Sequence, residues 1–331
     1  MNILITGGAS YIGSHVVKQL LDSKRHNITV LDSFKTGFEY TIETLKSFGE
    51  FEFIEQDLSK WDEVEAILQK NQFDVVIHFA ASLLVGESVE NPLKYYMNNT
   101  CNTANLVNLS NKYGVKKFIF SSTAAVYGEP SSDKMPLVET ELTNPINPYG
   151  NSKLMSEQII KDTASANKEF KYVVLRYFNV AGAEESLSIG ECHEPETHLI
   201  PLVVKTALGK RDKIFIFGDD YNTPDGTCIR DYIHVDDLAS AHISALDYLD
   251  ENDSEVFNCG YGHGFSVKEV IDMVKKVSEA DFEVEVAPRR AGDPAILIAD
   301  NKKILQKTNW KPKYDDLEFI CKTALEWEKK R

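Results

Sequence analysis

The fold is decided by the stretch NILITGGASYIG at residues 2–13. Residues 2–6 are an apolar run that predicts a strand, and residues 14–21 predict a helix. A glycine turn between a strand and a helix is the setting of a dinucleotide-binding fingerprint. Gly7 permits the tight turn and Gly13 lets the helix pack close to the strand, while free N–H groups at the helix start favour a pyrophosphate.

A carboxylate after the second predicted strand supports the same site. Residues 27–31 predict this strand, which ends at Asp32, about 20 residues after the glycine turn. An acid there suits the ribose hydroxyls of NAD and repels the additional phosphate of NADP. Taken singly, Asp32 is also compatible with a helix cap or a loop. Ser10 replaces the more usual glycine within the turn, and its Cβ crowds an approaching phosphate.

Strands and helices alternate along the first half of the chain. The run at residues 73–79 is nearly all apolar, which is typical of a strand buried on both faces. The alternation predicts an α/β fold with a doubly wound parallel sheet of the Rossmann type, whose ligands lie at the carboxyl ends of the strands. Further strands are predicted at residues 51–54, 116–121 and 172–175, and helices at 62–70, 92–113 and 152–168.

The character of the chain changes after Asn179, where residues 183–197 are loop-like and rich in Glu. We expect a smaller α/β substrate-binding domain interwoven with the first. The predicted division is a dinucleotide-binding domain of residues 1–176, to which about 231–258 return, and a second domain of residues 177–230 and 259–331. Within it we expect helices at 199–208, 266–278 and 317–329 and strands at 213–217 and 282–286.

Catalytic chemistry is predicted at residues 147–153, NPYGNSK. Tyr149 and Lys153 lie about one turn apart on one face of a helix. A free tyrosine, with a pKa of about 10, is a poor base, but a cationic neighbour favours the phenolate and lowers that pKa. The pair can therefore act as a proton shuttle. Taken alone, a Tyr and a Lys four residues apart are more often a surface pair. The catalytic interpretation therefore depends on a nucleotide-binding fold around them.

Composition excludes several classes of protein. The chain has 331 residues, 43% of them hydrophobic, which suffices for a large core. A net charge of −15 without a basic stripe argues against nucleic acid. We see neither a signal peptide nor an apolar run of about 18 residues, so no membrane segment is expected. The five scattered cysteines form no C-x-x-C pair, which predicts no zinc site and a reducing, cytoplasmic location.

The remaining motifs give the chain a family resemblance. Residues 78–81 (HFAA), Thr123, residues 176–179 (RYFN) and residues 230–234 (RDYIH) join the glycine turn and the Tyr-x-x-x-Lys pair. With these motifs in this order, the chain resembles the extended short-chain dehydrogenase/reductase family over essentially its whole length. Within that family it is similar to the enzymes that invert carbon 4 of UDP-hexoses. The resemblance implies bound NAD, a homodimer and interconversion of UDP-glucose and UDP-galactose.

The resemblance also implies catalytic roles. Tyr149 would take the proton of the sugar 4-hydroxyl while a hydride leaves carbon 4 for the nicotinamide. Lys153 would hold the nicotinamide ribose and lower the pKa of Tyr149, and Thr123 would bind the 4-oxygen. The 4-keto sugar would then turn over in a loose pocket and accept the hydride on its other face.

Binding residues follow from the same resemblance. The implied cofactor contacts are Gly7, Ser10, Tyr11, Ile12, Gly13, Asp32, Ser33, Phe34, Lys35, Thr36, Gly37, Asp57, Leu58, Phe79, Ala80, Ala81, Ser82, Leu83, Asn98, Thr123, Tyr149, Lys153 and Phe178. The implied substrate contacts are Thr123, Tyr149, Tyr177, Asn179, His198, Leu199, Arg230, Arg290, Asp293 and Leu297. Leu83 departs from the family, some members of which place a lysine there. Arg290 as surface charge, Arg230 paired with Asp231, and His198 as a loop residue stay open.

Other functions remain to be weighed. A UDP-N-acetylglucosamine or UDP-uronate 4-epimerase, or a hexose epimerase of dual specificity, is an alternative. Leu297 stands where a bulky Tyr excludes the N-acetyl group in some family members, so we expect UDP-N-acetylhexosamines also to be accepted. The related 4,6-dehydratases follow the Thr with an Asp-Glu pair, whereas Thr123 is followed by Ala124 and Ala125. A cofactor-sensing regulator without turnover would be expected to lack the Tyr or the Lys.

Overall fold

A parallel sheet of seven strands forms the centre of the computed structural model, which describes residues 1–290 and 292–331. Its order is β11-β6-β5-β4-β1-β2-β3, and every neighbouring pair is parallel. This confirms the predicted doubly wound Rossmann sheet. The strands are β1 (Asn2–Thr6), β2 (Asn27–Asp32), β3 (Glu52–Glu55), β4 (Val75–His78), β5 (Lys117–Ser121), β6 (Lys171–Tyr177) and β11 (Glu255–Cys259).

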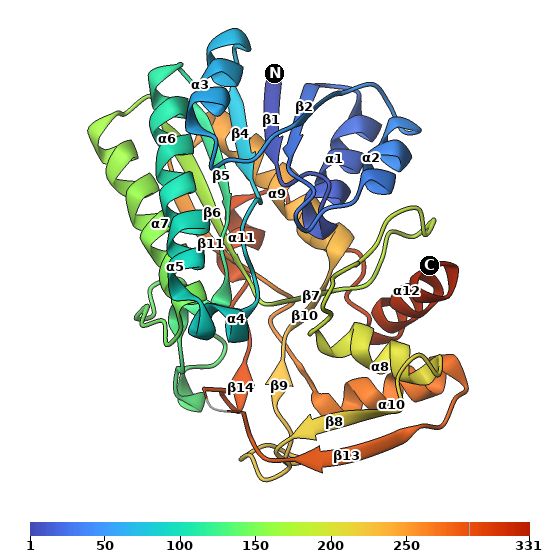
Figure 1. The fold of residues 1–331 in the computed structure, drawn as a ribbon. Coiled ribbons are helices and arrows are strands. Elements are labelled where there is room, and N and C mark those ends of the chain that lie inside the picture. The colour runs from blue at the N-terminus through green and yellow to red at the C-terminus, as the bar shows by residue number, and fades with distance from the viewer. Residues whose placement is uncertain (291) are drawn as a thin grey trace.

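Helices cover both faces of the sheet (Figure 1). One face carries α1 (Tyr11–Ser23), α2 (Glu39–Lys46) and α9 (Val235–Glu251). The other carries α3 (Trp61–Lys70), α5 (Pro92–Tyr95), the π-helical segment η1 (Tyr96–Cys101), α6 (Asn102–Lys112) and α7 (Pro148–Ala166).

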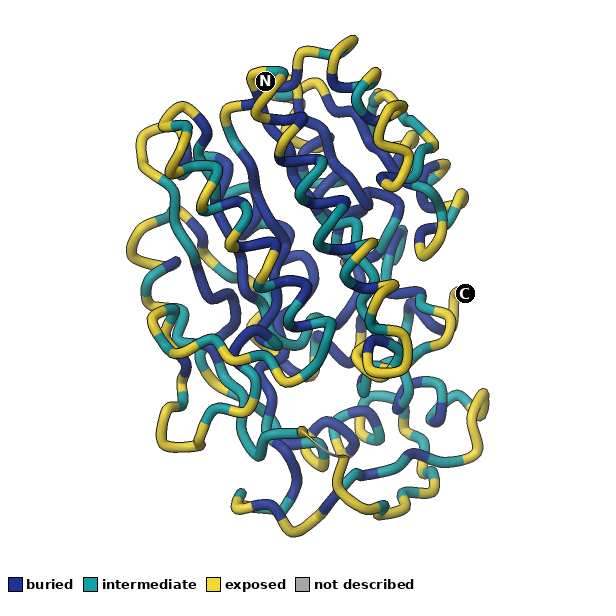
Figure 2. The backbone as a smooth tube through the Cα atoms, turned by 60° about the vertical axis from the view of Figure 1, so that its left-hand side comes forward, coloured by how far each residue is buried: buried dark blue, intermediate teal, exposed yellow. Residues whose placement is uncertain are grey.

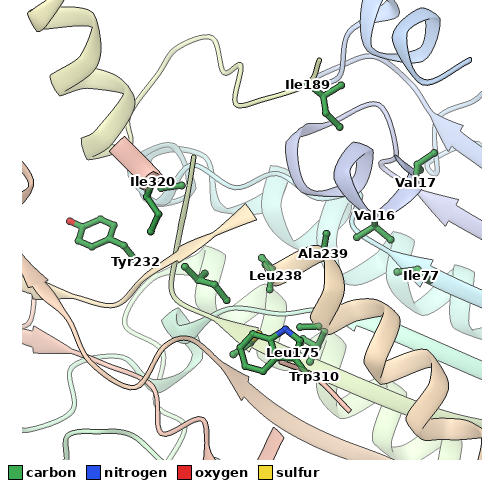
Figure 3. Packing of buried hydrophobic residues seen from close by; sticks show 14 of the residues in the cluster. Val16, Val17, Ile77, Leu175, Ile189, Tyr232, Leu238, Ala239, Trp310 and Ile320 are labelled. Atoms are coloured by element: carbon green, nitrogen blue, oxygen red, sulfur yellow. The ribbon is translucent and has the colours of Figure 1, made fainter. Parts of the chain in front are cut away.

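The sequence of each central strand explains this double cover. Side chains alternate between the faces of a strand, so Ile3 and Ile5 pack toward α1 and α9 while Leu4 packs toward α3 and α6. All three are fully buried, and the central strands are buried along their length in Figure 2. Figure 3 shows the hydrophobic core on the side of α1 and α9, where Val16 of α1 and Leu238 of α9 lie near residues of the strands.

Most of the remaining elements lie at the carboxyl end of the sheet, in the lower half of Figure 1, whereas α11 (Lys302–Lys307) packs beside β11. Helices α8 (Leu199–Ala207), α10 (Val267–Ser278) and α12 (Leu317–Lys330) pack together beside the parallel pair β8 (Lys213–Phe217) and β13 (Glu283–Ala287). Between them and the sheet lie β7 (Asn179–Ala181), β9 (Ile229–Arg230), β10 (Tyr232–His234), β12 (Phe265–Ser266) and β14 (Ile296–Leu297). Short helices are α4 (Val85–Glu90), α11, η2 (Ala124–Tyr127) and η3 (Ser132–Lys134).

Two predicted details differ in the structure. Residues 92–113 are not one regular helix, because η1 inserts a π-helical turn between α5 and α6. Helices α2 and α4 were not predicted from the sequence, and both are short and begin without a side-chain cap. Helix α9 packs on the central sheet and β11 is one of its strands. The division into two domains stays a prediction. Over the described ranges, no helix has the length and apolar character needed to cross a bilayer.

Candidate active site

A cavity of about 500 Å³ lies at the carboxyl ends of the strands. A second cavity of about 410 Å³ continues from it past Ser10, Thr36 and Ala81, which line both. A third of about 240 Å³ continues on the other side past Arg230 and Arg290. The three cavities share lining residues and together make one continuous path.

The structure brings most of the predicted site residues to this path. The central cavity is lined by Ser10, Tyr11, Ile12, Gly13, Thr36, Phe79, Ala81, Leu83, Thr123, Tyr149, Lys153, Tyr177, Phe178, Asn179, His198, Arg230, Arg290, Asp293 and Leu297. The second is lined by Gly7, Asp32, Ser33, Lys35, Asp57, Leu58, Ala80, Ser82 and Asn98, and the third by Leu199. Phe34 and Gly37 do not line these cavities: the Phe34 ring packs on Phe53, and Gly37 packs on Ala9.

The start of α7 is held close to the end of β5. Asn147 caps this helix, its side-chain oxygen accepting the N–H of Gly150 at 2.8 Å. A Cβ at Gly150 would lie 2.6 Å from the carbonyl oxygen of Ala125, so only glycine permits this approach. The close approach brings Tyr149 beside Thr123 in one cavity.

Burial dominates the protonation of the Tyr149–Lys153 pair. It raises the pKa of Tyr149 above the usual value, and the nearby Thr123 side chain opposes this only in part. Burial also lowers the pKa of Lys153 to about 7, although the carboxylate of Glu157 opposes it. The Lys153 ammonium donates to the carbonyl of Ser121 at 2.8 Å. The expected lowering of the Tyr149 pKa by Lys153 is therefore not found in the protein alone.

Asn99 positions this site and was missed by the sequence analysis. It lies in η1, and its side-chain oxygen accepts the Ser82 N–H at 2.8 Å. Its amide donates to the Ser82 carbonyl at 2.9 Å and to the hydroxyl of Ser152 in α7 at 3.0 Å. Asn99 thus ties the loop after β4 to the helix that carries Tyr149. The π-helical turn that aims it has no single-residue signal in the sequence.

The glycine turn is shaped as a cradle. Gly7 has φ +79°, and a Cβ there would lie 2.7 Å from the backbone nitrogen of Ala80. A Cβ at Gly13 would lie 2.2 Å from the carbonyl oxygen of Gly7. Ser10 is the N-cap residue of α1 and makes no side-chain cap, so the N–H groups of the first turn are left for a ligand. Ser10 lines two of the joined cavities, and the crowding of a phosphate by its Cβ stays a prediction.

Asp32 holds the glycine turn, and its contact with the NAD ribose stays a prediction. Its carboxylate accepts the N–H groups of Ala9 and Phe34, each at 2.9 Å, which fixes the glycine turn. It also lines the second cavity, where the remaining lone pairs can meet ribose hydroxyls. Lys35 forms an ion pair with Asp57 at the same cavity.

The basic end of the path is built around Arg230. This buried guanidinium forms an ion pair with Asp293 and donates to the carbonyl of Ile229 at 2.8 Å. The alternative pairing with Asp231 is wrong, because that carboxylate instead accepts backbone N–H groups, including that of Tyr261 at 2.9 Å. Arg290 lines two of the cavities, with its guanidinium 3.8 Å from the centre of the Phe217 ring. Two cations thus face the path.

His198 is more than a loop histidine. Its Nδ1 lies 2.8 Å from a carboxylate oxygen of Glu191 and 3.1 Å from one of Glu196. Burial alone would lower the pKa of His198, but these carboxylates outweigh it and raise the pKa to about 10. Glu191 and His193 also line the central cavity, and the sequence analysis did not single them out. They lie in the irregular segment 183–197, where no periodicity marks a site.

Residues 3–260 match the NAD dependent epimerase/dehydratase family. The chain belongs to this family. Membership makes NAD its cofactor, and the cradle of Gly7 and Gly13, with the joined cavities and Asp32, fits that group.

Several members of the NAD dependent epimerase/dehydratase family are similar over the whole chain. A UDP-glucose 4-epimerase of Streptococcus mutans is 46% identical over 99% of this chain and 96% of its own length. The structure of the UDP-Glc/GlcNAc 4-epimerase of Campylobacter jejuni is 59% identical with a TM-score of 0.88, covering 100% of this chain and 99% of its own. A UDP-glucose 4-epimerase of Bifidobacterium longum, solved with NAD+ and UDP, is 37% identical with a TM-score of 0.94, covering 100% and 98%.

Proposed function

We propose that the protein inverts carbon 4 of UDP-hexoses, interconverting UDP-glucose and UDP-galactose. The observation that carries this is the meeting of Thr123, Tyr149 and Lys153 in one cavity, between the dinucleotide groove and the two arginines. Relatives named UDP-glucose 4-epimerase, including that of Streptococcus mutans at 46% identity, support it.

Each side chain of the site has a task that its position suits. Bound NAD supplies the acceptor and donor of the hydride at carbon 4. The Tyr149 oxygen takes and returns the proton of the 4-hydroxyl, and Thr123 in the same cavity binds the 4-oxygen. Lys153 holds the nicotinamide ribose. Arg230 and Arg290 bind the diphosphate, since guanidinium groups pair bidentately with phosphate oxygens.

The side chains next to Thr123 support inversion over dehydration. Ala124 and Ala125 line the cavity there, and neither can donate or accept a proton. A non-catalytic regulator is disfavoured because the Tyr, the Lys and the Thr all reach one cavity. Loss of water from carbons 5 and 6 needs an acid and a base at those alanine positions.

The test is incubation of the purified protein with UDP-galactose and no added cofactor. We expect UDP-glucose to form over many turnovers, because NAD retained in the groove is regenerated in each cycle. Turnover that depends on added NAD in stoichiometric amounts would reject retention of the cofactor, and no inversion even with NAD present would reject the function.

We further propose that UDP-N-acetylglucosamine is a second substrate. Leu297 lines the cavity from β14 and is smaller than a tyrosine, so it leaves room for an N-acetyl group. The Campylobacter jejuni protein, 59% identical over the whole chain, is named for both UDP-Glc and GlcNAc. Epimerisation of UDP-N-acetylglucosamine no faster than in an enzyme-free blank would remove this proposal.

Enlarging residue 297 should narrow the substrate range. We expect Leu297→Tyr to lower kcat/KM for UDP-N-acetylglucosamine by about 10²-fold relative to UDP-galactose, because the ring takes the space of the N-acetyl group. Leu297→Met, which conserves volume, is the control and should keep both activities. Equal losses for both substrates in the tyrosine variant would show that residue 297 does not set the pocket size.

We also propose a homodimer in the cytoplasm. Large apolar side chains are exposed on α4, α5, η1 and α7, which pack side by side: Val89 (63%), Leu93 (72%), Met97 (59%) and Met155 (47%). A contiguous apolar surface of this kind suits a second copy of the chain. The five free cysteines suit a reducing compartment.

Charges on this surface should separate the copies. We expect the double variant Leu93→Glu and Met97→Glu to sediment as a monomer, while the parent chain sediments at twice that mass. Val286→Glu, which places the same charge on the exposed β13 at the far end of the molecule, should remain a dimer. A dimer that survives the double variant would place the contact elsewhere.

A further inference from the structure

A cluster of four metal-ligating side chains lies in the segment before α8. Glu191, His193, Glu196 and His198 each present one donor atom, and these four atoms lie within 4.8 Å of one another. Their spacing is Glu-x-His-x-x-Glu-x-His. None of these ligands is a cysteine, so the absence of C-x-x-C pairs did not bear on this cluster. Nothing in the proposed inversion requires all four.

The distances within the cluster suit a four-coordinate metal. Nδ1 of His198 lies 2.8 Å from Glu191 and 3.1 Å from Glu196. Nδ1 of His193 lies 3.1 Å from Glu191 and 3.9 Å from Glu196. Tetrahedral bonds of about 2.0–2.2 Å to zinc separate ligand atoms by roughly 3.3–3.6 Å, which falls within this spread. The four donor atoms are therefore close enough to one another to share one metal ion.

A second observation points to a ligand at this place. Glu191 is only 7% exposed, and its Oε2 atom has no hydrogen-bond partner among the described residues. A buried carboxylate oxygen without a partner is costly. Both histidines contact Oε1 of the same carboxylate, so the unpartnered Oε2 belongs to a group that already lies within the cluster.

We infer that Glu191, His193, Glu196 and His198 form a structural site for a divalent metal of the zinc type. Imidazole nitrogens with carboxylate oxygens are ligands that zinc accepts, and two carboxylates balance its charge. Four protein donors leave no open position, so the metal is structural and takes no part in the proton transfer. Ligation of His198 through Nδ1 leaves its Nε2 for the substrate.

The metal would fix the wall of the central cavity. Trp327 of α12 donates to the Glu191 carbonyl at 2.8 Å, which anchors one side of the segment. On the other side the His193 ring lies edge-to-face with Tyr11, their centres 6.2 Å apart. Tyr11 belongs to the glycine turn and donates to the Gly182 carbonyl at 2.6 Å. The cluster therefore joins the cofactor groove to the C-terminal helix.

The test measures metal directly and does not depend on turnover. The full chain, purified without a histidine tag, is stripped with a chelator, incubated with zinc and passed through a desalting column. We expect about one zinc per chain and a rise in Tm of about 5 °C over the stripped protein. Cobalt in place of zinc should give the intense visible bands of a four-coordinate site.

Matched variants separate this site from adventitious binding. His193→Gln and Glu196→Gln should each lose the zinc and the rise in Tm. His263→Gln removes a histidine that also faces one carboxylate, Asp315 at 2.8 Å, and should keep both. The proposal is overturned if all three variants bind zinc equally, or if the parent chain binds none. The four groups would then form only ion pairs between the two histidines and the two glutamates. Either result leaves the inversion of UDP-hexoses untouched.

Discussion

We expect Tyr149→Phe to lower kcat for UDP-galactose by about 10³-fold while NAD stays bound. The ring still fills its place in the cavity, so the loss comes from the oxygen alone. Burial raises the pKa of Tyr149 in the protein alone, and the Lys153 ammonium is turned to the Ser121 carbonyl. The cofactor and the substrate must therefore complete the environment that makes this phenol a base. Steady-state rates and the absorbance of bound NAD measure the two effects.

The matched control removes a neighbouring phenol oxygen. Tyr95 lies edge-to-face with Tyr149, their ring centres 6.4 Å apart, and its hydroxyl bonds to Leu84 and Glu87 and not to the cavity. We expect Tyr95→Phe to keep kcat within a few-fold. Similar losses in both variants would mean that Tyr149 supports the structure and does not transfer the proton.

Arg176→Met destabilises the fold by about 3–5 kcal/mol, the largest stability effect that we expect. Two guanidinium nitrogens of Arg176 bond to Glu157 at 2.9 and 2.6 Å, and the side chains are 4% and 0% exposed. Removing one partner leaves a buried charge without its counterion. Glu157 also accepts from the Ser122 hydroxyl at 2.6 Å, so the loss disturbs the helix that carries the site. Urea denaturation measures the change.

Two further variants isolate the ion pair. Arg176→Met combined with Glu157→Leu should recover much of the stability, because no charge is then left buried. Lys161→Ala removes the partly exposed partner of Glu157 and should cost less than about 1 kcal/mol. A double variant no more stable than Arg176→Met would show that packing, not charge, causes the loss.

The same pair predicts an acid dependence. Burial alone would raise the pKa of Glu157, but Arg176 outweighs it and holds that pKa below its usual value. A lowered folded-state pKa means that the stabilisation is present above the ordinary value of about 4.3 and is lost as the pH falls below it.

The local sequence pattern was sufficient to predict the central sheet and the glycine turn. Apolar strands such as β4 are set by burial on both faces, and the glycines of the turn by backbone geometry that other residues cannot adopt. The positions of Tyr149 and Lys153 followed from helical spacing. Membership of the family then confirmed the fold and the cofactor.

The hydrogen-bond and ion-pair partners of the site residues could not be predicted, because they lie far apart in the sequence. The lysine that was expected to act on Tyr149 is instead held by the carbonyl of Ser121, 32 residues away in the chain. Arg230 pairs with Asp293 and not with its neighbour Asp231, because backbone N–H groups take that carboxylate. Such partners depend on how loops meet after folding, which no local spacing encodes.

The central claim is that hydrogen leaves carbon 4 of the sugar and returns to the same atom within one closed site. The direct measurement is to convert UDP-galactose that carries deuterium at carbon 4, in ordinary water and without added NAD, and to analyse the product by NMR. The account predicts UDP-glucose that keeps its deuterium at carbon 4. Product with ordinary hydrogen at that carbon would show exchange with water and would contradict the account.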